Sequence, residues 1–201
     1  MSLMVLKFGG TSVGNKERLL HVAAIAKKNW QQGHQVVVVV SAQGDTTDEL
    51  LEKAAEIGSD LPLREMDMLL STGEQISIAL LAMALHQLGC PAVSLTGWQA
   101  GVRTDSQHTV ARVRFVENAR LKEELEKGKI IGILGPNGSG KTTFIKVLAG
   151  LLTTEGGVVR IAGKEIGVET KKMVSYLPER PYFSSSLKVK DTIRAFEDFY
   201  E

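Results

Sequence analysis

The sequence has little cysteine, few aromatic residues and almost no excess charge, and each shortage excludes a class of protein. Cys90 is the single cysteine, so no disulfide can form within the chain and a reducing, cytoplasmic location is expected. The 24 basic and 23 acidic residues give a formal net charge of +1, which does not favour nucleic acid or an anionic membrane as a partner. The four histidines lie far apart, so no zinc site is expected. The apolar stretches are judged too short for a membrane span, and no signal segment is expected.

What is present is the pattern of a buried parallel sheet. Residues 36–40 are five consecutive valines, which is typical of a strand covered by helices on both faces. We therefore predict an α/β fold, a three-layer α/β/α sandwich with a mostly parallel sheet and a P-loop. Further strands are predicted at residues 4–8, 92–95, 129–134, 158–161 and 173–177, and helices at 16–30, 46–57, 63–88, 118–127, 142–149 and 189–200.

Three local features refine this pattern. Residues 71–73, Ser-Thr-Gly, predict a hinge that divides the helix expected over 63–88 into two pieces. Thr46, followed three residues later by Glu49, predicts a capping box at the start of its helix. Residues 97–113 are polar and contain glycine, which predicts a hairpin.

Residues 135–142 have the G-x-x-x-x-G-K-T spacing of a P-loop. The glycines let backbone N–H groups converge on phosphate at a helix N-terminus, while Lys141 reaches the β- and γ-phosphates. A glycine turn with a chance lysine is the alternative, but the strand expected before it and the helix expected after it favour binding of ATP with Mg²⁺. The predicted nucleotide-binding residues are Gly135, Asn137, Gly138, Ser139, Gly140, Lys141, Thr142 and Thr143, with the Thr142 hydroxyl as the magnesium ligand.

Other polar segments also follow predicted strands. Gly9 and Gly10 come after the first strand with Lys7 beside them, and a turn rich in hydroxyl groups covers residues 41–48. Each has a plain structural explanation, a tight turn in one case and helix capping in the other. Open α/β sheets bind ligands along the edge formed by the carboxyl ends of their strands, so the turns together point to a site there. Trp98 either lines a ligand pocket or packs within its turn.

From residue 4 to about residue 129 the chain resembles the N-terminal part of aspartokinases, in the amino-acid kinase family. The resemblance rests on residues 7–13, 40–42, 44, 46–48, 71–74, 97–101 and 104–105. It implies that Lys7, Gly9 and Gly10 contact the transferred phosphate. It also implies that Ser41, Thr46 and Glu74 help to hold aspartate, with Lys7 and Glu74 as the catalytic pair.

From about residue 128 to the end, the chain instead resembles the ATP-binding subunit of an ABC transporter. Residues 135–143 match its Walker A motif, and residues 158–163 resemble the strand pair that follows. Residues 175–179 resemble the approach to the Q-loop, with Glu179 where glutamine is usual. We therefore interpret the chain as an engineered or recombined chimera. Residues 1–128 would be aspartokinase-like and residues 129–201 ABC-like, joined in one continuous α/β unit.

Both resemblances cover only part of the parent protein, and this sets the functional expectation. The main prediction is binding of ATP phosphates with little or no turnover. One alternative is a residual aspartate kinase that converts ATP and L-aspartate to 4-phospho-L-aspartate. Another is an inert engineered scaffold. L-Aspartate is thus a second candidate ligand, and the sequence predicts no oligomeric state.

Overall fold

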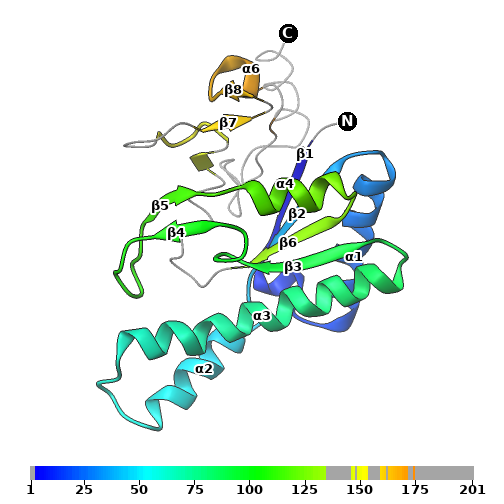
Figure 1. Cartoon of the computed structure of the whole chain (residues 1–201). Coiled ribbons are helices and arrows are strands. Elements are labelled where there is room, and N and C mark those ends of the chain that lie inside the picture. Colours follow the sequence, from blue (N-terminus) through cyan, green and yellow to red (C-terminus); the bar gives the residue numbers. More distant parts are fainter. Residues whose placement is uncertain are drawn as a thin grey trace, which may run out of the picture.

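The computed structural model describes residues 3–134, 146–147, 149–153, 159–161, 163–171 and 174. In chain order (Figure 1) the elements are β1 (Leu3–Phe8), the 3-10 helix η1 (Gly10–Ser12), α1 (Lys16–Gln31), β2 (Gln35–Val40), α2 (Thr46–Ala55), α3 (Leu63–Gln87), β3 (Ala92–Thr96), β4 (Val102–Thr104), β5 (Val113–Val116), α4 (Ala119–Glu126), β6 (Ile130–Leu134), β7 (Arg160–Ile161), β8 (Lys164–Glu165) and α6 (Val168–Lys171).

Among the described residues, the main sheet has four strands in the order β1-β2-β6-β3, and all three pairings are parallel. The register places Phe8 opposite Val40 and Thr96 opposite Leu134, so the four carboxyl ends meet at one edge. The valines of β2 are between 0% and 6% exposed, which confirms the prediction of a strand buried on both faces. Strand β6 joins the sheet as expected, between β2 and β3.

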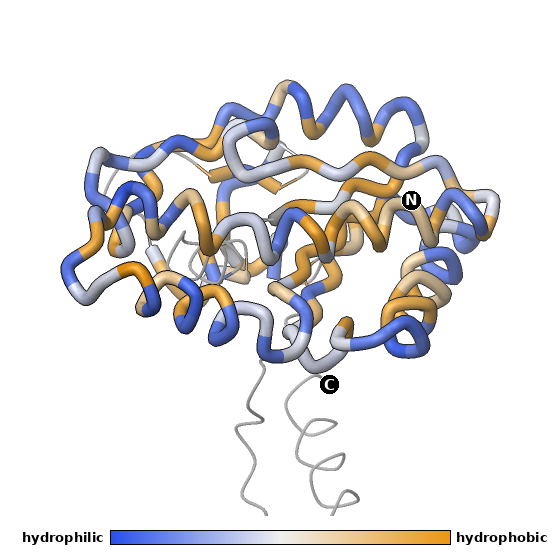
Figure 2. The backbone as a smooth tube through the Cα atoms, turned by 90° about the horizontal axis from the view of Figure 1, so that it is seen from below, coloured by the Kyte–Doolittle hydropathy of each residue, from blue (hydrophilic) through white to orange (hydrophobic). Residues whose placement is uncertain are grey.

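Helices cover both faces of this sheet, which confirms the three layers within the described residues. Helices α1 and α3 pack on one face, where Val22, Leu81 and Leu85 form a core with alternate valines of β2. Helix α4 lies on the opposite face, where Leu125 packs with Val37 and other residues. Figure 2 shows mostly hydrophobic strands at the centre and helices that alternate between hydrophobic and hydrophilic residues. This alternation is the pattern of helices with one buried side.

Helix α3 is continuous, so the predicted hinge at residues 71–73 is wrong. The Ser71 and Thr72 hydroxyls donate to the carbonyls of Met68 and Leu69 within the helix, so these groups are satisfied without a break. The predicted capping box is also wrong. Thr46 is the first residue of α2, and Asp45 occupies the cap position without a side-chain cap bond.

Length and composition alone would allow α3 to cross a membrane, contrary to the sequence expectation. Its most apolar 18-residue window has a mean hydropathy of 1.5, and 39% of that window is buried. Core helices of soluble proteins pass the same test. Ile78 and Leu81 of α3 are 2% and 1% exposed against the sheet, as expected of such a core helix.

In the described part of the chain, two small antiparallel strand pairs lie outside the main sheet. Strands β4 and β5 form a hairpin, as predicted, but β5 begins at Val113 and so extends beyond the predicted range of 97–113. Strands β7 and β8 form the second pair, and neither β8 nor α6 was predicted from the sequence. The strand expected at 173–177 and the helix expected at 189–200 lie outside the described residues, apart from residue 174.

Candidate active site at the carboxyl edge of the sheet

The loops that follow β1 and β2 are joined at the carboxyl edge. The Ser41 N–H donates to the Phe8 carbonyl over 3.2 Å, and the Gly44 N–H donates to the Gly10 carbonyl over 3.1 Å. A Cβ atom on Gly10 would overlap the carbonyl oxygen of Ala42. Glycine at position 10 therefore allows the two backbones to approach this closely.

Helix α3 reaches the same edge through a second glycine. A Cβ atom on Gly73 would lie 3.0 Å from Ala42 Cβ and 3.3 Å from Thr46 Cγ2. The absence of a side chain thus lets the helix pack directly on the loop after β2. The next residue, Glu74, is only 2% exposed. The structure therefore brings the predicted residues Gly10, Thr46 and Glu74 to one region from three separate segments.

Lys7 approaches this edge from the other side of the sheet. It is next to last in β1 and pairs in register with Val39. Its neighbour two positions back, Val5, packs in the α4-facing core, whereas Phe8 packs in the core under α1 and α3. By strand alternation Lys7 shares the face of Val5. Burial lowers the pKa of Lys7, because a desolvated ammonium group is less stable than a hydrated one.

These groups are chemically suited to an anion and to an amino group. Lys7 and the N–H groups of the turn at Gly9 and Gly10 favour a phosphate or carboxylate, while the buried carboxylate of Glu74 favours a cationic ammonium group. Within the part of the chain described, no cluster of three His, Cys, Asp or Glu side chains could hold a metal ion.

Strand β6 leads directly into the predicted P-loop. Strand β6 ends at Leu134, opposite Thr96, at the carboxyl edge. The next residues of the motif lie outside the described residues, namely Gly135, Asn137, Gly138, Ser139, Gly140, Lys141, Thr142 and Thr143.

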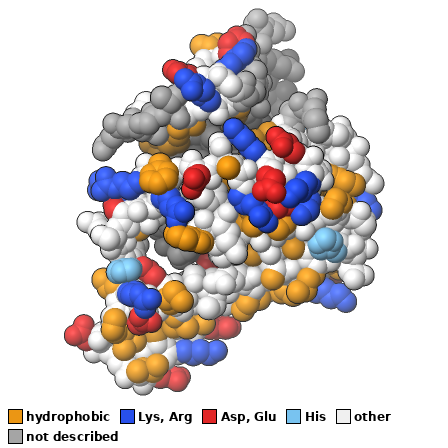
Figure 3. All heavy atoms as spheres, viewed as in Figure 1, with side chains coloured by type: hydrophobic (Ala, Val, Ile, Leu, Met, Phe, Trp, Pro, Cys, Tyr) orange, Lys and Arg blue, Asp and Glu red, His pale blue; other side chains and the backbone are white. Residues whose placement is uncertain are grey.

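A second feature, which the sequence indicated only through Trp98, is a pocket of about 290 Å³ between the turn after β3 and the start of α4. Charged side chains gather over α4 on this face of the molecule (Figure 3). Two arginines enter the pocket from different elements, and only the tertiary structure brings them together. The pocket is lined by Trp98, Gln99, Gly101, Arg103, Glu117, Ala119 and Arg120.

Comparison with known proteins identifies the relatives of this chain. Residues 2–167 match the model of the amino acid kinase family. The chain is 52% identical over 148 residues to the aspartokinase of Geobacillus stearothermophilus, and 54% identical over 150 residues to aspartokinase 2 of Bacillus subtilis. Each match covers 74% of this chain and 36% of the relative. The crystal structure of aspartate kinase from Synechocystis is 39% identical, with a TM-score of 0.61, over 78% of this chain and 29% of that one.

The matched proteins support the aspartokinase resemblance and do not show an ABC transporter segment. The family model extends past residue 128, the end of the predicted aspartokinase-like segment. The boundary between residues 128 and 129 stays a prediction. The parallel sheet, the convergent loops and the family match agree with one another. The chain therefore belongs to the amino acid kinase family.

Proposed function

We propose that the carboxyl edge of the sheet binds L-aspartate and the transferred phosphate, and that the chain carries out the reaction of an aspartate kinase. ATP and L-aspartate would give 4-phospho-L-aspartate and ADP. The observation that supports this most directly is the meeting of three segments, the loop at Gly10, the loop at residues 41–46 and helix α3 at Glu74. The high identity to aspartokinases over the same region adds to it. The chain spans 36% of the length of these relatives, so the whole activity is part of the proposal.

The reaction needs positioning and charge stabilisation more than proton transfer. A side-chain carboxylate oxygen of aspartate attacks the γ-phosphorus, and the bond from that phosphorus to the bridging oxygen of ADP breaks. The attacking carboxylate is already ionised, so no base has to remove a proton. Lys7 and the turn amides at Gly9 and Gly10 would stabilise the charge on the transferred group. Glu74 would hold the α-ammonium group of aspartate, with Ser41 and Thr46 as further hydrogen-bonding partners.

A second candidate function is ATP binding by the segment 129–201 with little turnover, as expected of an ABC-like fragment. The spacing of residues 135–142 supports it, together with the position of β6, whose last residue lies at the carboxyl edge. In this proposal Lys141 binds the phosphates and Thr142 supplies a hydroxyl to Mg²⁺. A cytoplasmic location belongs to either proposal, since both rely on ATP as the ligand.

One set of measurements distinguishes the aspartate kinase from the second candidate function, ATP binding with little turnover. Aspartyl phosphate is trapped with hydroxylamine at saturating ATP, Mg²⁺ and aspartate, and ATP binding is measured by calorimetry. For the kinase, Lys7→Met and Glu74→Gln should each abolish product formation, whereas Lys53→Met and Glu65→Gln, at exposed positions of α2 and α3, should not.

For the second candidate, wild type should bind ATP without forming product, and Lys141→Ala should weaken binding about tenfold or more. Wild-type product that persists in Lys7→Met and Glu74→Gln would contradict the proposed kinase site. Absence of both product and ATP binding would leave the inert scaffold as the correct interpretation.

A further inference from the structure

The turn after β3 that forms one side of the pocket is held by a close backbone contact and several hydrogen bonds. Gly101 has a φ of +84°, and a Cβ atom there would overlap the backbone of Glu117. The Glu117 N–H donates to the Gly101 carbonyl over 2.9 Å, which holds the end of β5 against the turn. Thr96 and Gln99 exchange two hydrogen bonds of 3.0 and 3.2 Å between backbone N–H groups and side-chain oxygens. The turn that carries Trp98 is therefore held in place on both sides.

Arg103 lines this pocket, and among the described residues its guanidinium group makes two contacts, neither of which is a hydrogen bond. Its Cζ atom lies 3.9 Å from the centroid of the Trp98 ring, in a cation–π contact. Its ion-pair partner in the described part of the chain is Glu117, at 3.8 Å, which is too long for a hydrogen bond. The Glu117 side chain is 66% exposed and can turn into solvent, so it does not block an incoming anion.

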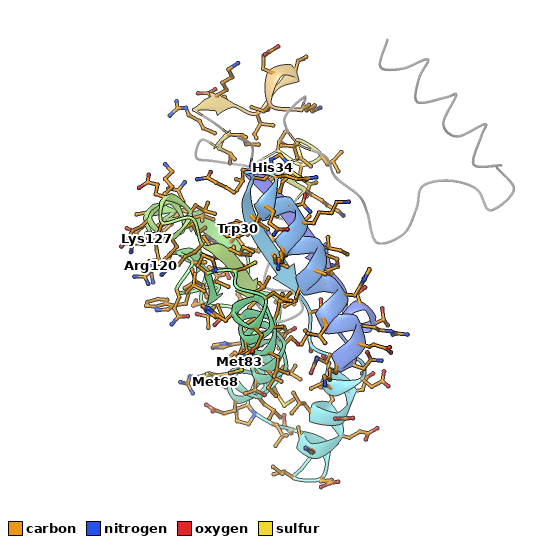
Figure 4. All side chains as sticks on the ribbon, turned by 90° about the vertical axis from the view of Figure 1, so that its right-hand side faces the viewer. Trp30, His34, Met68, Met83, Arg120 and Lys127 are labelled. Carbon is orange, nitrogen blue, oxygen red and sulfur yellow. The ribbon has the colours of Figure 1, made fainter. Side chains whose placement is uncertain are left out.

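Arg120 supplies a second guanidinium group from α4. One of its nitrogens, Nη2, lies 2.8 Å from Glu124, and its side chain is 53% exposed. Figure 4 shows Arg120 and Lys127 close to each other at α4. A guanidinium group has five N–H donors in a planar fork, so the contact with Glu124 leaves donors available for a ligand.

We propose that this pocket binds a phosphate group through Arg103 and Arg120, with the Trp98 ring as one wall. Two guanidinium groups with free donors are the usual means of recognising a tetrahedral oxyanion, because each can donate two parallel hydrogen bonds. A free phosphate ion and the phosphate of a nucleotide share the same chemistry, a dianionic phosphate, and the test below distinguishes the two sources. None of the residues that line this pocket belongs to the loops at Gly10 and Glu74 or to the predicted P-loop, residues 135–143.

The test uses the fluorescence of Trp98. The chain has two tryptophans, so Trp30→Phe leaves Trp98 as the single reporter. Inorganic phosphate and AMP are titrated separately at constant ionic strength, with chloride as the balancing anion. A saturable change in emission is expected with at least one of them. A response to AMP alone would show that the phosphate is recognised on a nucleotide.

Three variants in that background decide where the anion binds. Arg120→Gln leaves the contact between Arg103 and Trp98 intact and should weaken binding about tenfold. Arg64→Gln, at an exposed position of α3, should bind as the background does. Lys141→Ala shows whether the predicted P-loop lysine is the source of the response. Loss of the response in Lys141→Ala with retention in Arg120→Gln would overturn the proposal. So would a linear change that chloride reproduces.

Discussion

Glu124 is a buried carboxylate surrounded by cations, and its replacement by glutamine tests how α4 is joined to β6. The side chain is 1% exposed. Lys129 Nζ donates to one oxygen over 2.6 Å, Arg120 Nη2 lies 2.8 Å from the other, and Lys127 Nζ is 3.8 Å away. In Glu124→Gln, one oxygen is replaced by an NH₂ group that donates rather than accepts. One cation therefore loses its acceptor and meets a second donor.

The expected cost follows from these contacts. Hydrogen bonds to charged groups contribute about 1.5–3 kcal/mol. The cations around Glu124 are one third to one half exposed and can regain water. We therefore expect Glu124→Gln to lower the free energy of unfolding by an amount within that range rather than above it. For a chain of this length, each kcal/mol changes the melting temperature by about 3 °C, so a decrease of roughly 5–9 °C is expected.

The stability that Glu124 contributes should be lost as pH falls. The hydrogen bond from Lys129 is the largest cause that lowers the pKa of Glu124 below its ordinary value of 4.5, with Lys127 and Arg120 adding to it and burial opposing it. A group with a lowered folded-state pKa stabilises the protein above its unfolded pKa, and this stabilisation is lost as pH falls through the folded pKa. The difference between wild type and Glu124→Gln should therefore be constant from about pH 7 to pH 5 and should decrease below about pH 4.5.

Urea unfolding at several pH values measures this difference. Glu126→Gln is the matched control, since it makes the same change at an exposed position of α4 and should alter the free energy of unfolding by less than about 0.5 kcal/mol. Lys129→Met and the double variant complete a cycle that should show coupling between Glu124 and Lys129. Equal stability of Glu124→Gln and Glu126→Gln at pH 7, or a difference that grows on acidification, would refute this reasoning.

Two further predictions concern the site loops and the sheet. Gly10→Ala should destabilise the fold by about 1–3 kcal/mol, because its Cβ meets backbone, whereas Gly58→Ala, with ordinary van der Waals space, should change stability by less than about 1 kcal/mol in the same urea assay. Equal effects of the two would contradict the close approach of the loops. Val38→Ala, at a fully buried position, should cost about 2 kcal/mol, and Val110→Ala, at a residue 66% exposed, should cost little. Comparable losses from both would argue against a central β2.

The helices and strands were predictable where a short run of residues shows by its composition whether it is buried or exposed. Five consecutive valines can be covered only by apolar layers on both faces, so residues 36–40 indicated a central strand before any contact was known. The glycines after β1 and the hydroxyl-rich turn after β2 also indicated the edge of the candidate site. In each case the information lies within a few neighbouring residues.

Prediction failed where one local signal had more than one structural meaning. Gly73 indicated a hinge within α3, but its role is to let the helix approach Ala42 and Thr46. Thr46 indicated a helix cap, but it became the first residue of α2. Glycine and threonine are used both to interrupt helices and to pack or bond within them, and the choice depends on what lies opposite.

The sequence by itself determined the strands of the main sheet, most of the helices, the layered fold and the segments that form the candidate active site, because periodicity and turn chemistry are local. Only the tertiary structure decided that β6 lies between β2 and β3 and that its Gly132 accommodates Ile78 of α3. It also decided that Arg103 and Arg120 share a pocket. These relations join residues far apart in the chain, and they depend on which surfaces pack together, a choice that no short stretch of sequence records.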